Sequence, residues 1–151
     1  MFFRIQTLYM LVALLVTSCC LPQAIAAIQD TSAQEVALVY NLCMVQGEAL
    51  SFAVCPLFIL LLVPVCMAIV FLFNTTKRML QAKLCLWGMG AYVAWYVCYL
   101  AYWWFDWSSK GSCVETKWTA WLPLVALIAM AMARRGVLAD ERLVRSADRI
   151  R

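Results

Sequence analysis

The chain has 151 residues, of which 66% are hydrophobic and 13% are charged, and its formal net charge is +4. A soluble domain of this length carries about 25% charged residues, so the composition indicates an integral membrane protein. Histidine is absent, which removes the commonest metal ligand, the usual general base at neutral pH and the usual axial ligand of haem. We therefore expect no metal, no cofactor and no enzymatic activity.

The predicted membrane spans are four apolar runs, at residues 5–28, 50–74, 84–105 and 118–133. About 20 apolar residues cross a bilayer, and the first three runs are long enough. The fourth gives roughly 24 Å of helix. It is about 6 Å too short, a difference that snorkelling of Lys117 and Arg134 absorbs. The predicted fold is an all-α membrane protein with small extracytoplasmic loops, in which residues 1–133 form the four-helix transmembrane domain.

The second half of the first run has three interpretations. Residues 16–19, Val-Thr-Ser-Cys, match a lipobox in which Cys19 is lipidated, and residues 24–26, Ala-Ile-Ala, match a signal-peptidase site. The third interpretation is a helix that is never cut. The apolar run is longer than the 7–15 residues of a signal peptide, which favours a retained helix. Lipidation of Cys19 and removal of the first helix remain alternatives.

Positive charges are divided unequally between the two sides of this arrangement. Of the twelve Lys and Arg residues, only Lys110 and Lys117 lie in the first and third connections. The others lie at the N-terminus, between the second and third runs, and in the tail. Cytoplasmic segments carry this excess of basic residues. The pattern predicts that both termini face the cytoplasm and that the first and third connections lie outside.

Two cysteines, Cys43 and Cys113, lie in the outer connections. Residues 34–46 and 112–116 are predicted to form short strands that bring the two thiols together, although the first segment is equally compatible with an amphipathic surface helix. In an oxidising compartment the two cysteines would form a disulfide. Cys19 and Cys20 approach the same side and are competing partners. No C-x-x-C motif occurs, which argues against a catalytic dithiol.

A stripe of small residues recurs at intervals of three and four along the third run: Gly88, Ala91, Ala94, Cys98 and Ala101. Such stripes let the backbones of two membrane helices approach closely. The fourth run offers matching small residues at Ala126, Ala129 and Ala133. We expect the third helix to pack on the fourth in the same chain, with a homo-oligomer interface as the alternative. The aromatic residues of the third run are expected on its other faces.

The tail, residues 134–151, is predicted to contain a short amphipathic helix that opens near Asp140. Three basic residues share one of its faces, Arg142, Arg145 and Arg149, and Glu141 is placed to pair with Arg145. A basic amphipathic helix beside a membrane lies on anionic headgroups. The alternative is a docking surface for a cytoplasmic protein. The interleaved acids dilute the basic charge, so we expect no nucleic-acid partner.

Four segments carry a resemblance to a known family: residues 4–9 (RIQTLY), 77–81 (KRMLQ), 121–124 (WLPL) and 139–151 (ADERLVRSADRIR). Together they resemble a family of small bacterial integral membrane proteins catalogued as domain of unknown function 4293. The resemblance covers the whole chain, and the tail is its most specific part. It implies four helices, a retained first helix and a multi-pass protein of the bacterial inner membrane. It implies no activity.

Our first hypothesis for the function is a non-enzymatic accessory or scaffold subunit of a membrane assembly, with the lipid bilayer and another protein as partners. The second is an oligomeric channel or transport component. The four runs contain no ionisable Asp, Glu, Lys or Arg, which argues against a coupled transporter, although small polar groups can line a pore. The third is a membrane thiol-redox protein.

Overall fold

The computed structural model describes residues 5–29, 36–74, 78–107 and 113–148. The helices and strands in chain order are α1 (Ile5–Cys20), β1 (Ala24–Gln29), β2 (Val36–Tyr40), β3 (Met44–Gln46), β4 (Ala49–Ser51), α2 (Cys55–Phe73), α3 (Arg78–Tyr102), the π-helical turn η1 (Trp103–Trp107), β5 (Cys113–Thr116), the 3₁₀ turn η2 (Trp118–Trp121) and α4 (Leu122–Asp148).

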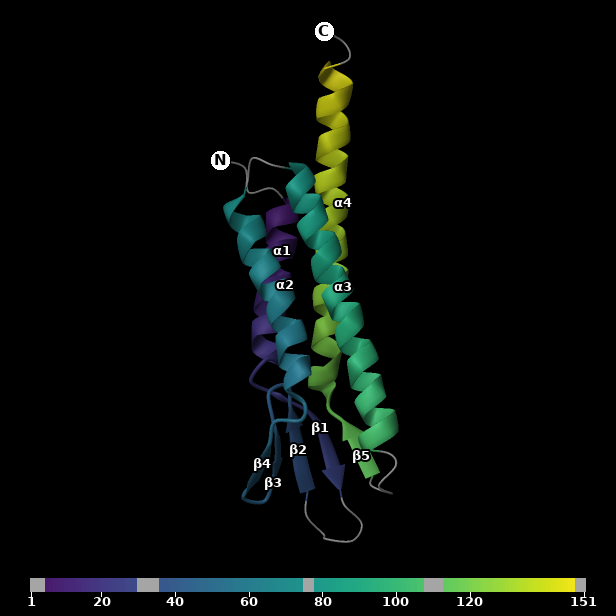
Figure 1. Ribbon diagram of the computed structural model, residues 1–151. Helices are drawn as coiled ribbons and strands as arrows, with labels where there is room; N and C mark the ends of the chain where they lie inside the picture. Colours follow the sequence, from purple (N-terminus) through teal and green to yellow (C-terminus); the bar gives the residue numbers. More distant parts are fainter. Residues whose placement is uncertain (1–4, 30–35, 75–77, 108–112, 149–151) are drawn as a thin grey trace.

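The helices form a bundle in which successive helices run in opposite directions (Figure 1). α1 packs against α2 and α4, and α3 packs against α2 and α4. The chain termini lie at one end of the bundle, and the strands lie at the other end (Figure 1). Three helical segments are long and apolar enough to cross a membrane: Cys55–Phe73, Met79–Trp107 and Trp118–Ser146. The remaining helix, α1, is apolar but has 16 residues.

The sequence predicted one continuous helix over residues 5–28, but the structure divides this run into a helix and a strand. α1 ends at Cys20, and residues Ala24–Gln29 form β1. Pro22 lacks the backbone N–H that a helix needs, so it ends the helix shortly after Cys20. A short apolar run is compatible with either a buried helix or a buried strand. Here it forms a strand, and the expected all-α fold is corrected to a mostly helical fold with a small sheet.

The sheet has five strands in the order β4-β3-β2-β1-β5, and all neighbouring strands are antiparallel. The strands expected within residues 34–46 and 112–116 are confirmed as β2, β3 and β5 in the described part of those segments, and the alternative of a surface helix is wrong. The β3–β4 turn contains Gly47 at φ 55°, a conformation that glycine adopts without steric cost.

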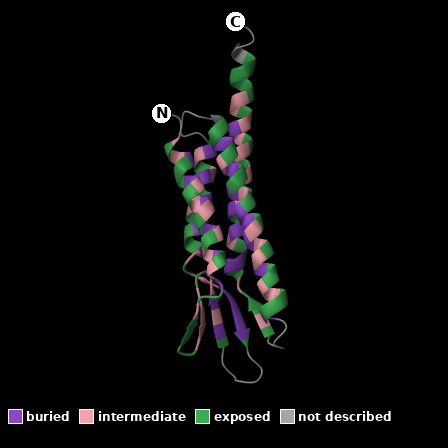
Figure 2. Ribbon diagram, in the orientation of Figure 1, coloured by how far each residue is buried: buried purple, intermediate pink, exposed green. Residues whose placement is uncertain are grey.

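Buried residues, purple in Figure 2, follow the inward faces of the helices and cover most of β1. The inward face of α3 is aromatic. Tyr92, Trp95 and Tyr99 are buried there, and the Trp95 and Tyr99 rings stack with centroids 5.3 Å apart. The aromatic residues were expected on faces other than that of the small stripe, and the structure shows that a face carrying these three is buried in the core as well. Large apolar rings pack the core more completely than the small stripe does.

Candidate functional site

No group of three or more Cys, Asp or Glu side chains that could hold a metal ion occurs among the described residues. The structure places the candidate residues of the sequence in three regions: the sheet, the α3–α4 interface and the end of α4 near the chain termini.

The expected Cys43–Cys113 disulfide is absent, and all eight cysteines are free. Gln29 of β1 lies opposite both Val36 and Cys113, so Cys113 is at the end of the sheet farthest from the bundle. Cys43 follows β2 at the other end. The two positions are separated by about five residues of strand, roughly 16 Å, whereas the Cα atoms of a disulfide lie about 4.4–6.8 Å apart. The β1 strand between β2 and β5 keeps them apart.

The competing partners of these cysteines are also free. Cys20 is buried, and its thiol donates a hydrogen bond to the carbonyl oxygen of Thr119 at 3.6 Å. Cys19 is exposed on the neighbouring position of α1. The cysteines therefore do not pin α1 to the sheet in this structure; hydrogen bonds do.

The small-residue stripe of α3 changes from buried to exposed along its length. Gly88 and Ala91 are buried, Ala94 and Cys98 are partly buried, and Ala101 is exposed. Cys98 and Ala101 line a cavity of about 510 Å³ with Pro56 of α2. The first half of the stripe is thus at the α3–α4 interface, whereas its second half faces the start of α2. The three alanines that were matched to it on α4 are all buried.

Gly88 lies at a point where α3 packs closely against Met130 of α4. A Cβ atom added there would lie 2.5 Å from the sulfur of Met130 and 3.7 Å from Cβ of Pro64. We expect Gly88→Ala to lower the free energy of unfolding by about 1–3 kcal/mol, because the buried Met130 must move in a packed core. Gly90→Ala on the same helix is the control, since an added Cβ there meets nothing within 4 Å. It should be neutral or stabilising by up to about 1 kcal/mol. Thermal unfolding in detergent measures both changes, and equal melting temperatures would contradict the close approach.

The sequence predicted a separate short helix in the tail that opens near Asp140. This prediction is wrong, because α4 runs without a break from Leu122 to Asp148. Its last turns project alone beyond the other three helices (Figure 1). The expected pairing is confirmed: the Arg145 guanidinium lies 3.0 Å from the Glu141 carboxylate. Arg142 is exposed, and Arg149 lies outside the described residues. The predicted boundary between residues 133 and 134 falls inside α4.

A network of hydrogen bonds joins the bundle to the sheet, and its centre is Asn41 in the turn after β2. Asn41 is fully buried. Its Nδ2 donates to the carbonyl oxygen of Cys20 at 3.0 Å, and its Oδ1 accepts a hydrogen bond from Nε1 of Trp95 at 3.2 Å. One side chain thus connects the sheet to α1 and to α3.

Further bonds surround Asn41. The Thr17 and Tyr92 hydroxyls share a hydrogen bond between α1 and α3. The Tyr99 hydroxyl lies 3.0 Å from the Thr116 hydroxyl of β5, and the Tyr96 hydroxyl donates to the Ala120 carbonyl oxygen at 2.9 Å. These polar groups use one another as partners, which is the usual condition of buried polar side chains. We interpret this region as structural, and the sequence pattern did not single out Asn41.

The Gln6 amide at the other end of the bundle is only partly paired. Gln6 of α1 is only 6% exposed, and its Nε2 lies 3.4 Å from the Oδ2 atom of Asp140 on α4. Its Oε1 has no hydrogen-bond partner. The stem of Gln6 lies across Gly136, where an added Cβ would be 3.2 Å from Cβ of Gln6. The absence of a side chain at Gly136 therefore lets α1 and α4 approach closely here.

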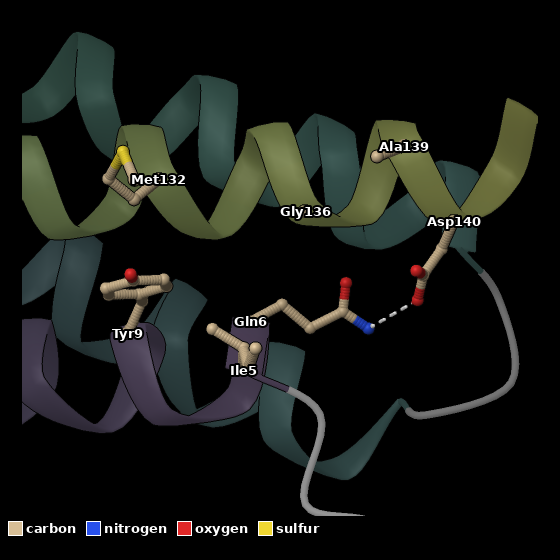
Figure 3. Close-up of a pocket in the computed structure, with 7 residues that line it drawn as sticks. All are labelled: Ile5, Gln6, Tyr9, Met132, Gly136, Ala139 and Asp140. Atoms are coloured by element: carbon tan, nitrogen blue, oxygen red, sulfur yellow. Dashed lines mark hydrogen bonds between the residues drawn. The ribbon is translucent and has the colours of Figure 1, made fainter.

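A cavity of about 420 Å³ lies between α1 and α4 at this point (Figure 3). Its lining consists of Ile5, Gln6, Tyr9, Met132, Gly136, Ala139 and Asp140. Figure 3 shows the Gln6 amide reaching toward Asp140 at one end, with Tyr9 and Met132 facing each other at the other end. The cavity is therefore polar at the end nearest the chain termini and apolar deeper along the bundle. It is the candidate binding site of the described structure.

These features define a class of protein: a small bundle of four antiparallel helices, three of them long and apolar enough to span a membrane, with a five-stranded sheet at one end. A family model described as "Domain of unknown function (DUF4293)" matches residues 2–150, so the chain belongs to this family. The resemblance noted from the sequence is thereby confirmed. No curated protein matches the chain.

Proposed function

We propose that this protein is a non-enzymatic scaffold subunit of a membrane assembly, and that it docks a cytoplasmic protein through the projecting end of α4. The observation that carries the proposal is the exposure of two apolar side chains on those last turns, Leu143 at 69% and Val144 at 41%. Apolar residues on an otherwise charged helix are typical of helices that bind in a groove of a partner. A helix lying on headgroups would instead turn away from the bundle axis, and α4 continues without a break.

The proposed membrane arrangement has four crossings of a bacterial inner membrane, with both termini in the cytoplasm. All four helices lie side by side, so α1 would cross together with the other three. Its 16 residues span about 24 Å at 1.5 Å per residue. The hydrocarbon core is about 30 Å thick, and local thinning makes up the difference at modest cost. The sheet would then lie just outside the membrane.

Packing within the bundle favours a scaffold over a channel formed by one copy. The fully buried side chains include Trp95, Tyr92, Phe71 and Met10, which fill the space between the helices. The buried polar residues of the described chain are Gln6, Thr17, Asn41, Gln81 and Thr119, and none is ionisable. Ion and proton pathways in membranes usually contain ionisable side chains. A pore would therefore have to form between several copies.

Photo-crosslinking from the end of α4 tests the docking proposal. A photoreactive amino acid at Leu143 should form an adduct with one protein in native membranes, because this side chain is exposed beyond the bundle. Ile128 is the matched control on the same helix, also exposed but within its apolar part, where adducts should be with lipid. Deleting residues 141–151 should reduce co-purification of the crosslinked protein at least about tenfold, as expected when a few anchor residues dominate an interface.

Two results would contradict this proposal. Adducts only with a second copy of the chain would indicate a homo-oligomer in place of a scaffold. Solute or ion leakage from liposomes that contain only this protein, above that of empty liposomes, would favour the oligomeric channel.

A further inference from the structure

The Gln6 amide has one orientation that its surroundings allow. The Asp140 carboxylate lies 3.4 Å from one amide atom, and an ionised carboxylate only accepts hydrogen bonds. That amide atom must therefore be the nitrogen, and the unpartnered atom must be the oxygen Oε1. A buried carbonyl oxygen without a donor is costly, so it marks a place where a donor is missing.

The polar end of the cavity therefore offers acceptors and negative charge. Oε1 of Gln6 needs an N–H or O–H donor, and the neighbouring Asp140 carboxylate favours a donor that is positively charged. A primary ammonium group meets both conditions, because it carries three N–H donors and one positive charge. A quaternary ammonium group carries the charge but has no N–H to donate.

The rest of the cavity fits a hydrocarbon. Its walls are formed by Ile5, Tyr9, Met132 and Ala139, and Ile5 is largely exposed at the rim. Its volume of about 420 Å³ is within the range of small-molecule sites, roughly 300–1,000 Å³. In the proposed topology the polar end lies at the cytoplasmic boundary of the bilayer, and the apolar end lies at the depth of acyl chains. A lipid would enter this cavity sideways from the membrane.

We propose that the α1–α4 cavity binds a phospholipid with a primary ammonium headgroup, which donates hydrogen bonds to Oε1 of Gln6 and to Asp140 while the first part of an acyl chain contacts Tyr9 and Met132. The inference rests on the membrane insertion proposed above, and it is independent of docking at Leu143.

Native mass spectrometry of the full chain in detergent tests this site. The probes are phosphatidylethanolamine, phosphatidylcholine and phosphatidylglycerol with identical acyl chains. We expect phosphatidylethanolamine to bind about tenfold more tightly than phosphatidylcholine, the difference that hydrogen bonds from a charged donor typically make. Gln6→Leu should abolish this preference. Gln81→Leu is the matched control, because Gln81 is also buried with an unpartnered Oε1 but lies on α3 and does not line this cavity.

Each other outcome overturns the proposal. Equal affinity for the three lipids would mean that the headgroup is not recognised. Equal affinity for phosphatidylethanolamine and phosphatidylcholine would mean that the ammonium charge acts without hydrogen bonding, and a preference for phosphatidylglycerol would indicate hydroxyl donors. If Gln6→Leu does not fold, Asp140→Asn, on a partly exposed residue, must lower the preference. Loss of the Leu143 crosslink with the lipid preference intact would reject only the docking proposal, and the reverse result would reject only the lipid site.

Discussion

Replacing Asn41 by leucine should lower the free energy of unfolding by about 1–3 kcal/mol, because it leaves the buried indole N–H of Trp95 without its acceptor, and an unsatisfied buried group typically costs that much. The carbonyl oxygen of Cys20 loses the Asn41 donor as well, but it still accepts a hydrogen bond from the backbone N–H of Gln23 at 3.3 Å. Leucine has four side-chain heavy atoms branched at Cγ, as asparagine does, so the change removes the hydrogen bonds while it keeps the branching of the side chain, and the larger volume of leucine can only add to the loss. The loss is a large fraction of the stability of a typical domain.

Asn74→Leu is the control for this substitution. Asn74 also donates from Nδ2 to a helix carbonyl oxygen, that of Val70 at 3.0 Å, but its bond is exposed. Water replaces an exposed partner, so the effect should be below about 1 kcal/mol. Loss of native tryptophan fluorescence on heating in detergent gives both melting temperatures. If the two variants have the same melting temperature, the hydrogen bonds of Asn41 do not stabilise the contact between the sheet and the bundle.

The three longer helices could be predicted from the sequence because an uncharged, apolar stretch of about 20 residues is typical of a membrane-spanning helix. Their ends could not. The predicted runs 84–105 and 118–133 stop where charges begin, whereas α3 starts at Arg78 and α4 continues to Asp148. Charge marks where a helix leaves the apolar environment. It does not end the helix, because Lys, Arg and Glu are good helix formers.

The sheet was only partly predictable. Residues 24–28, Ala-Ile-Ala-Ala-Ile, are apolar at every position, so they lack the alternation that distinguishes a half-buried strand from a helix. The β1 residues Ile25, Ala26, Ala27 and Ile28 are all buried, so β1 is covered on both of its faces. This strand also explains why the predicted disulfide is wrong. The sequence places Cys43 and Cys113 in the two outer connections, but it does not show that β1 lies between the strands that carry them.

The hydrogen bonds of Asn41 and Gln6 could not be predicted from the sequence. Asn41 contacts a tryptophan 54 residues later, and Gln6 contacts an aspartate 134 residues later. Neither pair has a local spacing that indicates contact. The only signal in the sequence was an isolated asparagine or glutamine within or beside an apolar segment, which is ambiguous because such residues also occur at helix ends and in turns.

Thiol labelling should separate the two ends of the molecule completely. Cys113 is exposed on β5, and the proposed orientation places β5 outside the membrane. A membrane-impermeant maleimide should label Cys113 in intact cells without a reductant, because the thiol is free. Peptide mapping should show that Cys113→Ser removes this label, whereas Cys43, which is partly exposed on the same side, is counted separately by its own peptide. The counterpart of Cys113 is Ser146→Cys in the Cys113→Ser background. Ser146 is exposed on the last turns of α4, and we expect its label only after the membrane is permeabilised.

The other exposed cysteines, Cys19 and Cys66, need not interfere with this measurement. Cys66 lies in the middle of α2, within a proposed span that a charged reagent does not enter, and Cys19 is replaced by serine in every variant. If Ser146→Cys is labelled in intact cells and Cys113 is not, the orientation in the membrane is opposite to the proposed one. Labelling of both positions from the same side would mean that α4 does not cross, since α4 is the only helix between them. Protection of Cys113 until a reductant is added would indicate a disulfide that requires a different sheet register, because β1 separates Cys113 from Cys43.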